Sequence, residues 1–539
     1  MKQIRLAISF FLFFTLTGKA QFSVDSTQAF AVCNAGSAQQ SVRAFSLEGS
    51  GYISTWIDKR NGSNGTGLYL QRLDTSGVPL LAANGLEIYS AVGKEIWGYD
   101  IAPWQNGFLI AWVQGGFGIG GDSLFCDYID ASGNHLWNQP INVSNKTASV
   151  IYISQIGLKV MPNDSGAFIT YGLVISGGAD FFSFNRIDFT GNLYWPVNNF
   201  VIALNGYVFV PEYDQHNGFY VATSGGGIGA PIKVQHYGLD GASTFPAEID
   251  VTQGTGGRNI SWSVLCDADT NAYVIWDDNT GDIRISKINP RGNLVWPSGF
   301  KTVCGYSGAQ AYLSPLLYNN TIYVTWSDGR IPAANAFIYV QKMDTSGTAL
   351  WTPDGVSVCR LNSYIPYAKL AAGRNGNIVN TYLAGGTFRA QCLAPDSTSL
   401  WQNNGIPVAS AAVPFYDDYV LVSDTSGAVA AFWSDDNDIF AARISPDGIL
   451  TKTNTLNPES FSIYPNPASG LLYIKCDHNY KQVNTRILSY TGQVVVPEQP
   501  VNNASTQFSV ISLTGLASGI YMVEIAADGN KFVHRLVIE

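Results

Sequence analysis

The chain has 539 residues, of which 30 are Lys or Arg and 40 are Asp or Glu, so charged residues form only 13% and the net charge is −10. Aromatic residues form the same share, and this balance excludes a disordered chain, which would be rich in charge and poor in aromatics. The acidic balance argues against a nucleic-acid partner, because phosphate binding needs clustered Lys and Arg. The 55 glycines predict many turns between buried aromatic strands.

The first 20 residues have the pattern of a secretory signal peptide. Lys2 and Arg5 precede an apolar stretch at 6–16, and a small-residue ending follows. We therefore expect cleavage between Ala20 and Gln21. No later stretch approaches the ~20 apolar residues that a membrane helix needs, so we predict an exported mature chain without a transmembrane segment.

Seven cysteines are scattered through the chain without a C-x-x-C pair. They are too few for a disulfide scaffold and too dispersed for a metal site. Cys33, Cys304 and Cys359 each end a similar apolar stretch. We therefore expect these thiols to be buried in strands.

A repeated unit fills the middle of the chain and is clearest at 321–359. An alternating stretch at 322–326 ends in Trp326, a second at 338–343 leads to a turn at 344–347, and a third at 355–359 closes the unit. Alternation of period two between Gly, Asn and Asp turns is typical of β-strands. With the stretch at 311–317, each unit supplies about four strands.

Two anchor positions of this unit recur about every 54 residues. The counterparts of Trp326 are Trp56, Trp112, Tyr171, Thr223, Trp276, Tyr382 and Trp433. The turn glycine recurs at Gly77, Gly133, Gly191, Gly241, Gly292, Gly347 and Gly448, with Ser397 in the remaining copy. Both anchors therefore indicate eight copies.

Four-stranded units repeated at this spacing are typical blades of a β-propeller. We predict an all-β fold with an eight-bladed propeller over residues 21–451, and seven blades are the alternative if the fourth copy, around Thr223, is irregular. The stretch at 29–33 matches the closing strand of a unit but precedes the first full repeat. We infer that it completes the last blade, because this closes the ring and removes exposed strand edges.

The last eighty residues differ in composition, with no Trp beyond Trp433. A polar linker at 452–459 is followed by short alternating stretches at 471–474, 485–488, 508–510, 521–525 and 531–537. This pattern predicts a small Ig-like antiparallel β-sandwich over residues 460–539. Gly519, two residues before Tyr521, predicts a turn with positive φ.

Three sequence blocks in this region carry a specific resemblance. They are Phe461–Ala468, which contains Tyr464, Pro465, Asn466 and Pro467; Tyr490–Val494, which contains Gly492; and Leu516–Val523, which contains Gly519 and Tyr521. In this order they resemble the type A C-terminal sorting domain of the type IX secretion system. The resemblance implies a Bacteroidota protein whose C-terminal domain interacts with that secretion machinery and is removed near 452–459, leaving the protein surface-attached or released.

The usual sequence markers of catalysis and of cofactor binding are missing. The chain has five His and contains neither H-E-x-x-H nor G-x-S-x-G. Two literal G-x-G-x-x-G/A matches, at 116–121 and 225–230, precede predicted strands rather than the helix that phosphate binding requires. We therefore expect no cofactor and no metal, and we name no catalytic residue.

The pattern Trp-x-Asp recurs at Trp56/Asp58, Trp276/Asp278, Trp326/Asp328 and Trp433/Asp435. One interpretation is a ring of carboxylates that holds a cation or polar sugars. The other is structural, with Trp packed between blades while Asp accepts N–H groups of the turn. We favour the structural interpretation because the motif is repeated, whereas a binding site needs only a few copies.

A ligand site should lie on the face shared by the loops that leave the Trp strands and the loops that join successive blades. Our candidate residues for this face are Trp97, Asp278, Asp328, Tyr364, Tyr367, Tyr416 and Asp417. Further residues of the same loops are Tyr99, Asp100, Tyr306, Phe415 and Asp418. Aromatic rings beside carboxylates suit stacking on sugars or gripping a peptide.

Three functional hypotheses follow from these patterns. The leading one is a noncatalytic binding or adhesion module on the cell surface or outside the cell, with a glycan or protein ligand. The second is a carbohydrate-active hydrolase or lyase that uses Asp278, Asp328 or Asp417. The third is a structural component of a surface assembly, which should show a large apolar patch rather than a pocket.

Overall fold

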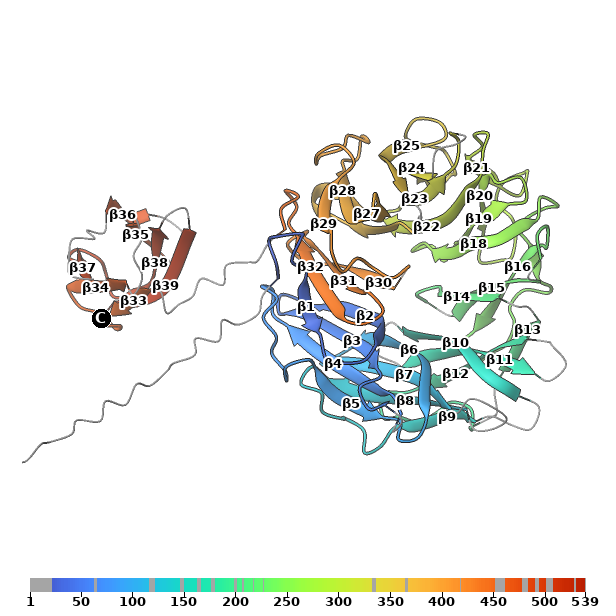
Figure 1. Ribbon diagram of the computed structural model, residues 1–539, viewed down its shortest axis with the longest axis horizontal. Helices are drawn as coiled ribbons and strands as arrows, with labels where there is room; N and C mark the ends of the chain where they lie inside the picture. The colour runs from blue at the N-terminus through green and yellow to red at the C-terminus, as the bar shows by residue number, and fades with distance from the viewer. Residues whose placement is uncertain are drawn as a thin grey trace, which may run out of the picture. The chain divides into compact units, whose positions relative to one another are not determined.

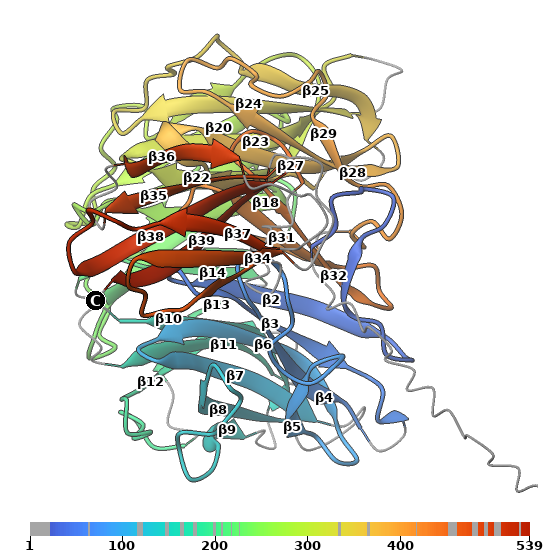
Figure 2. The same ribbon diagram turned by 90° about the vertical axis from the view of Figure 1, so that its left-hand side faces the viewer.

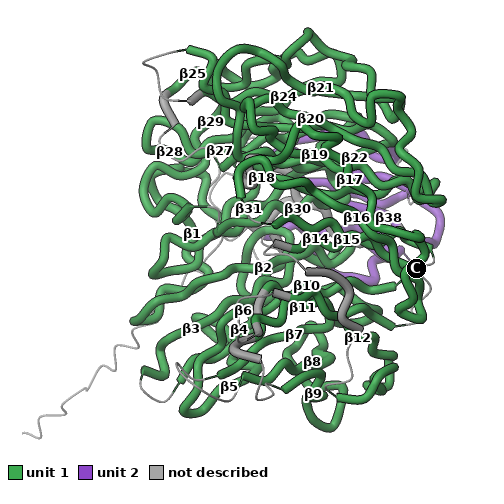
Figure 3. The backbone as a smooth tube through the Cα atoms, turned by 90° about the vertical axis from the view of Figure 1, so that its right-hand side faces the viewer, with its two compact units in different colours: residues 1–452 green, residues 453–539 purple. Residues whose placement is uncertain are grey.

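The computed structural model describes residues 22–450 and 461–538, except for short stretches at 63–64, 116–121, 146–149, 162–165, 176–179, 198–200, 206–207, 217, 226, 332–335, 364–366, 417, 477–482, 490–493, 501–507 and 528–529. The predicted cleavage site at Ala20 and Gln21 and the predicted linker at 452–459 therefore lie outside the described residues. The chain divides into two compact units, residues 1–452 and 453–539, coloured green and purple in Figure 3.

In the described part of the first unit, the strands form eight four-stranded antiparallel sheets. Sheets 1 to 4 consist of β2 (Gln39–Leu47), β3 (Gly51–Asp58), β4 (Gly67–Leu73) and β5 (Leu86–Ser90); β6 (Glu95–Trp104), β7 (Gly107–Gly115), β8 (Ser123–Asp130) and β9 (Ile141–Asn145); β10 (Val150–Val160), β11 (Ala167–Ile175), β12 (Asp180–Ile187) and β13 (Val201–Asn205); and β14 (Val208–Tyr213), β15 (Gly218–Ser224), β16 (Ile232–Gly238) and β17 (Ile249–Asp250).

Sheets 5 to 8 continue the same order along the chain, and the last one takes its fourth strand from the N-terminus. They consist of β18 (Gly257–Cys266), β19 (Ala272–Asp278), β20 (Ile283–Ile288) and β21 (Lys301–Cys304); β22 (Gln310–Tyr318), β23 (Thr321–Asp328), β24 (Ala336–Asp344) and β25 (Val356–Ser363); β26 (Lys369–Ala372), β27 (Ile378–Ala384), β28 (Thr387–Leu393) and β29 (Ile406–Ala409); and β30 (Tyr419–Ser423), β31 (Val429–Ser434), β32 (Ile439–Ile444) and β1 (Phe30–Cys33). A 3-10 turn, η3 (Arg374–Gly376), lies between β26 and β27.

The sheets follow one another around a ring, with the first strand of each sheet toward the centre (Figure 1). Each of these inner strands contacts the inner strand of the next sheet, and β30 of sheet 8 contacts β2 of sheet 1. The hydrophobic clusters of this unit each join two neighbouring sheets; one packs Tyr52 and Trp56 of sheet 1 against Phe432 and Ile439 of sheet 8. Because both faces of a sheet are covered in this way, second strands such as β3 and β7 are buried along their whole length.

The two anchors of the repeat occupy equivalent places in the sheets. Among the largest fully buried side chains are Trp56, Trp112, Trp276, Trp326 and Trp433, together with Tyr171 and Tyr382. The seven turn glycines have φ between 76° and 87°, and Ser397 in the remaining copy has φ 77°. Glycine adopts such angles without steric cost, which explains why this position of the turn favours it. The positions of the two repeat anchors that the sequence predicts are therefore confirmed.

The N-terminal strand β1 completes sheet 8, as the sequence analysis expected. It pairs antiparallel with β32, so that Phe30 lies opposite Ala441 and Ala31 lies opposite Phe440. Phe30 and Val32 are buried in the cluster that joins sheets 8 and 1. The first and last strands of the unit therefore hold the same sheet together.

The second unit contains two antiparallel sheets around one core. One sheet has β33 (Phe461–Tyr464), β34 (Leu471–Cys476) and β37 (Phe508–Ser512) in the order β33-β34-β37. The other has β36 (Val494–Pro500), β35 (Val483–Ser489), β38 (Gly519–Ala527) and β39 (Asn530–Ile538) in that order, and β35, β38 and β39 lie side by side in Figure 2. Its core includes Leu472, Ile474, Ile487, Ile511, Val523 and Ile525.

One local expectation for this unit is wrong. Gly519 begins β38 and does not have positive φ, whereas Gly515, four residues earlier, has φ 90°. The turn before β38 is therefore made at Gly515, and Gly519 is an ordinary strand residue. No helix among the described residues is long and apolar enough to cross a membrane.

Candidate functional site

The inner strands begin at the same edge of the ring at which the Trp strands end. Gln39 at the start of β2 pairs with Asp58 at the end of β3, and Gln310 at the start of β22 pairs with Asp328 at the end of β23. We call this edge and its loops the loop face. The opposite edge, which carries turns such as the one at Gly347, is the turn face.

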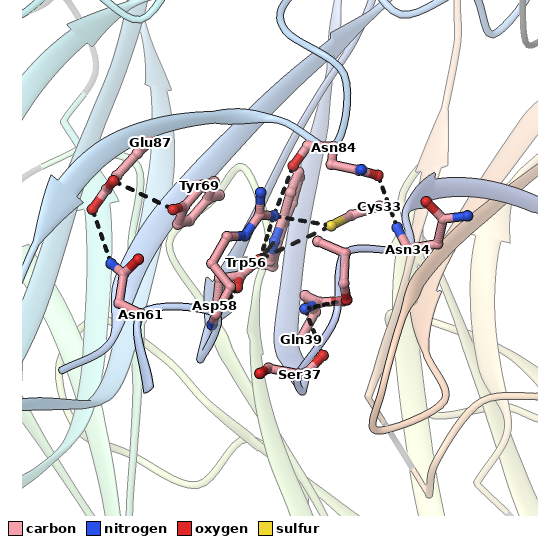
Figure 4. Close-up of polar contacts among 12 residues, drawn as sticks. Cys33, Asn34, Ser37, Gln39, Trp56, Asp58, Asn61, Tyr69, Asn84 and Glu87 are labelled. Carbon is pink, nitrogen blue, oxygen red and sulfur yellow. Dashed lines mark hydrogen bonds and ion pairs between the residues drawn. The ribbon is translucent and has the colours of Figure 1, made fainter. Parts of the chain in front are cut away.

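The first Trp-x-Asp motif forms a closed polar cluster at the end of β3 (Figure 4). Trp56 Nε1 donates to Asp58 Oδ2 over 3.0 Å, and the Arg60 backbone N–H donates to Asp58 Oδ1 over 2.8 Å. The Arg60 guanidinium donates to Asp58 Oδ2 over 2.6 Å and to the Asn84 carbonyl over 2.8 Å. The Asp58 side chain is fully buried, so the fold itself uses its carboxylate.

Sheet 6 repeats this cluster around Asp328. Trp326 Nε1 donates to Asp328 Oδ2 over 2.7 Å. The Arg330 guanidinium donates to both Asp328 oxygens over 2.7 Å and to the Asp354 carbonyl over 2.8 Å. The structural interpretation of the motif therefore holds for sheets 1 and 6.

Sheet 5 keeps the carboxylate but changes its donors. Asp278 accepts hydrogen bonds from the Thr280 N–H and hydroxyl and from Arg284 Nε. Burial by itself raises the pKa of Asp278, but these hydrogen bonds outweigh burial and lower that pKa. Asp278 and Asp328 are each only 1% exposed, so the expectation that they face a ligand is corrected. Their oxygens satisfy donors of their own sheet.

Removing the Asp328 carboxylate should destabilise the first unit strongly. The side chains of Asp328 and Arg330 are 0% and 12% exposed, so Asp328→Ala leaves a buried guanidinium and the Trp326 N–H without their acceptor. Loss of one partner of a buried ion pair costs about 3–5 kcal/mol of unfolding free energy. Denaturant unfolding of the full chain measures this loss. Asp396→Ala, which removes an exposed turn carboxylate, is the matched control and should have a much smaller effect; equal effects of the two substitutions would contradict the prediction.

The thiols beside these clusters are not activated nucleophiles. Arg60 Nη2 lies 3.1 Å from Cys33 Sγ, a contact that favours a thiolate. Burial has the larger effect and raises the pKa of Cys33 to about 11 and that of Cys304, which ends β21 of sheet 5 beside Arg330, to about 12. Both thiols therefore stay protonated near neutral pH. Cys33, Cys304 and Cys359 are buried and not in disulfides, as expected, and the same holds for Cys126, Cys266 and Cys392.

Polar side chains of the inner strands hold the neighbouring sheet. Both Asp418 oxygens accept N–H groups of the bulge in β2, from Ser41 over 2.7 Å and Val42 over 3.0 Å. Asp100 Oδ2 accepts the Leu158 N–H of the next sheet over 2.9 Å. Burial raises the pKa of Asp418 despite its hydrogen bonds. These carboxylates therefore tie adjacent sheets together; Asp100 and the buried Tyr99 lie inside β6 and not in a loop, which corrects the expectation for them.

The aromatic candidates of the loop face are more exposed than the carboxylates. Trp97, at the start of β6, is 41% exposed, and Tyr416 is 49% exposed. The Tyr416 ring packs edge-on against Phe415, itself 47% exposed, with centroids 4.5 Å apart. Tyr367 is half-buried before β26. Tyr364 and Asp417 lie outside the described residues.

Sequence reasoning missed Tyr312, which the structure brings to this group. Its ring lies 5.1 Å from the Tyr367 ring, in a T-shaped contact that joins sheets 6 and 7. Tyr312 has φ 55° within the register shift between Ala311 and Ser314 of β22. No local sequence signal marks this bulge, because residues other than glycine rarely adopt positive φ. Tyr306, in the loop before β22, is 47% exposed and lies 4.5 Å from the Arg330 guanidinium.

One polar cluster at the turn face has the residue types of a catalytic triad. The Thr244 hydroxyl lies 2.8 Å from His236 Nδ1, and His236 Nε2 lies 3.0 Å from Asp214 Oδ2. A hydroxyl, imidazole and carboxylate in this order are the parts of a hydrolase triad. The same places in sheets 5 and 8 are occupied by the ion pairs Lys287–Asp267 and Arg443–Asp424. The cluster is therefore one copy of a repeated clamp between the third strand and the first hairpin of a sheet.

The described residues contain no group of three or more His, Cys, Asp or Glu side chains placed to hold a metal ion. The acidic residues described above instead accept hydrogen bonds from Trp, Arg and backbone N–H groups. The described part of the loop face therefore combines exposed aromatic rings with carboxylates that already accept hydrogen bonds from the protein itself.

The predicted sorting motif is divided between two structural roles. Asn466 Oδ1 accepts the Val537 N–H over 2.9 Å, so the motif holds the last strand, β39. The Tyr464 ring stacks on Tyr473 with centroids 5.7 Å apart, and 39% of Tyr464 is exposed. The Tyr521 hydroxyl donates to the Ala517 carbonyl over 2.9 Å. Pro465 and Pro467 are exposed beside Asn466, and Gly492 lies outside the described residues.

Comparison with known families decides what this second unit is. The model of the secretion system C-terminal sorting domain matches residues 462–539, which include both sheets of the unit. The second unit is a type IX sorting domain. The sorting domain indicates secretion to the cell surface or the extracellular space and implies interaction with the type IX secretion machinery.

The chain is distantly similar to several solved structures. The chain is similar to prolyl oligopeptidase B from Galerina marginata bound to a 35mer substrate, at 10% identity and a TM-score of 0.40, over 76% of this chain and 56% of that one. It is also similar to Pyrococcus horikoshii acylaminoacyl peptidase, at 9% identity and a TM-score of 0.36, over 71% and 58%. The chain thus spans less than two thirds of the length of these peptidases. No curated protein sequence matches the chain.

Proposed function

We propose that the protein is an exported eight-bladed β-propeller that binds an extracellular glycan without catalysing a reaction, followed by an Ig-like sorting sandwich. In this proposal residues 1–20 are the signal peptide, 21–451 the propeller, 452–459 the processed linker and 460–539 the sorting domain. The sorting domain delivers the propeller to the surface or to the medium. The propeller then acts as a binding or adhesion module.

One observation carries the binding proposal: half-exposed aromatic rings gather on the loop face of consecutive sheets. We call this group the aromatic arc; its described members are Tyr306, Tyr312, Tyr367, Phe415 and Tyr416. Tyr312 of sheet 6 contacts Tyr367 of sheet 7, and the Tyr419 hydroxyl of sheet 8 donates to the Tyr367 carbonyl over 3.0 Å. Rings fixed in this way lose little entropy on binding and offer flat apolar surfaces on which sugar rings stack.

The catalytic alternative has less support. A glycoside hydrolase needs two carboxyl groups about 5–9 Å apart across the scissile bond. Of the three carboxylates considered for this role, Asp278 and Asp328 are buried among their own donors. Asp417 lies outside the described residues. Binding without turnover is therefore the function that we propose.

A glycan-array screen of the purified full chain tests the proposal, with a double variant of the arc as the decisive comparison. Phe415→Ser with Tyr416→Asn removes two exposed rings, and Asn tolerates the positive φ of 54° at position 416. Loss of two stacking rings should weaken glycan binding at least about ten-fold. Isothermal titration with the best array ligand gives the affinity.

The matched control is Tyr194→Asn, which removes a tyrosine that is 56% exposed on the turn face. It should leave glycan affinity unchanged. Equal loss in both variants, binding only to peptides, or release of shortened sugars from the best ligand would each contradict the proposed function.

A further inference from the structure

The two sheets of the sorting domain differ in the middle of their outer faces. On the four-stranded sheet, Arg486 of β35 lies directly opposite Glu524 of β38, and their charged groups are 2.7 Å apart. Asn484 of β35 donates to Glu498 of β36 over 2.8 Å. These pairs make the middle of this outer face polar, as is usual for an antiparallel sheet on a core, while Val494 at the start of β36 is 47% exposed.

The three-stranded sheet departs from this rule. Its inner side chains, such as Leu472 and Ile511, are buried in the core, so the alternate positions point outward. Two of these outward side chains are apolar and strongly exposed, Leu471 at 45% and Val510 at 54%, whereas Lys475 and Ser512 on the same strands are polar. An exposed apolar face of this kind lowers the solubility of a domain. Such faces are typical of surfaces that bind another molecule.

The apolar side chains form a continuous row across all three strands. Tyr464 of β33 pairs with Tyr473 of β34, and Tyr473 pairs with Val510 of β37. The Tyr464 and Tyr473 rings are stacked with an interplanar angle of 13°. Leu471 lies two residues from Tyr473 on the same side of β34. We call these four residues the sorting face.

The sorting face gives a role to Tyr464, the residue of the sorting motif that does not help to close the sandwich. Asn466 holds the end of β39, and Ala468 is buried with its N–H donating to the Val537 carbonyl over 2.8 Å. Tyr464, at the start of the same motif, instead presents its ring beside Tyr473 at the surface. One half of the motif therefore closes the sandwich, and the other half builds the exposed row.

We propose that the sorting face is the surface by which a protein of the type IX secretion machinery holds this chain during passage of the outer membrane. The occupant follows from the assignment of the unit, since residues 462–539 are a sorting domain and contain the whole face. Stacked tyrosines flanked by aliphatic side chains are typical anchors of protein interfaces. The proposal rests on the sorting-domain assignment and is independent of glycan binding by the first unit.

Export of the full chain from a bacterium that has a type IX secretion system tests this proposal. Tyr473→Thr and Val510→Thr each remove an anchor while keeping a residue that suits an exposed strand. Each should reduce the amount that reaches the surface and medium about ten-fold, with a matching increase in the periplasm, because loss of an interface anchor costs roughly this factor. Immunoblots of the separated fractions give the distribution.

The matched control is Val494→Thr, because Val494 is 47% exposed but lies on β36 of the other sheet. Its export should equal that of the unchanged chain. Melting curves of all purified full-length variants should coincide; if Tyr473→Thr lowers the melting temperature, Val510→Thr, at the more exposed site, decides the outcome.

Three results would overturn the proposal. Normal export of Val510→Thr would show that the face is not needed. Equal loss of export in Val494→Thr would show a general effect of changing the domain surface. A dimer of the purified full chain that dissociates in Val510→Thr while export stays normal would assign the face to a second copy of the chain.

Discussion

A chain that ends at Glu459 is expected to accumulate in the periplasm, whereas the full chain reaches the surface or the medium. The truncation removes the sorting domain at 462–539 but leaves the predicted signal peptide and the whole first unit. Among the described residues, the buried core cluster of the sorting domain runs from Ala468 to Ile538. The sheets of the first unit therefore keep their cores, and only the export signal is lost.

Cell fractionation with immunoblotting measures this effect, and surface protease treatment separates exposed from periplasmic protein. The effect should be nearly complete, in contrast to the partial losses expected from single substitutions on the sorting face. A matched control replaces Tyr194, at the turn face, in the full chain and should be exported normally. Export of the truncated chain at the level of the full chain would contradict the prediction.

Removal of residues 22–33 is expected to open the ring of sheets and to cause aggregation. This segment contains β1, which covers the edge of β32, a strand whose residues are all buried. Without β1, the unpaired N–H and C=O groups of β32 form an exposed edge that other chains can pair with. The deletion also removes Phe22, Phe30 and Val32 from the cluster that joins sheets 8 and 1.

The substitution Phe30→Ala tests the packing contribution of β1 separately from its protection of the β32 edge. Phe30 is 6% exposed, so Phe30→Ala should cost about 3–5 kcal/mol of unfolding free energy while keeping the strand pairing. Val24→Ser changes a residue of the same segment that is 57% exposed and should have little effect. Denaturant unfolding measures the substitutions, and size-exclusion chromatography measures the aggregation of the deletion. A monomeric deletion variant with unchanged melting would show that β1 does not close the ring.

The repeat was predictable because its signals are local and recur. A Trp at the end of a buried strand and a glycine in a turn with φ between 76° and 87° each act within a few residues, and eight copies reinforce one another. The role of β1 was predictable for the same reason, since Phe30–Cys33 repeats the pattern of a closing strand. Tyr312 escaped prediction because its bulge in β22 depends on the neighbouring sheet, where the Ser261 hydroxyl accepts the Leu313 N–H over 3.0 Å.

The candidate site was predicted in part. The choice between ligand and structural roles for Asp328 needed the positions of the Trp326 and Arg330 donors. The exposure of Trp97 and Tyr416 agrees with their place on the loop face, although a ligand for them stays a proposal. The His236–Asp214 contact was not foreseen, because His236 lies on β16 and Asp214 lies in the hairpin between β14 and β15, and no spacing in the sequence joins them.

The sequence by itself determined the repeat, the positions of its anchors and the sorting domain, because period-two alternation, turn glycines and motif blocks all act over short stretches of chain. Only the tertiary structure decided which polar groups are satisfied and which aromatic rings remain exposed. Asp418 meets the Ser41 N–H across 377 residues of sequence, and Tyr464, Tyr473 and Val510 form one row only when three strands pair. Burial and hydrogen bonding are properties of neighbours, and ring closure and strand pairing determine those neighbours.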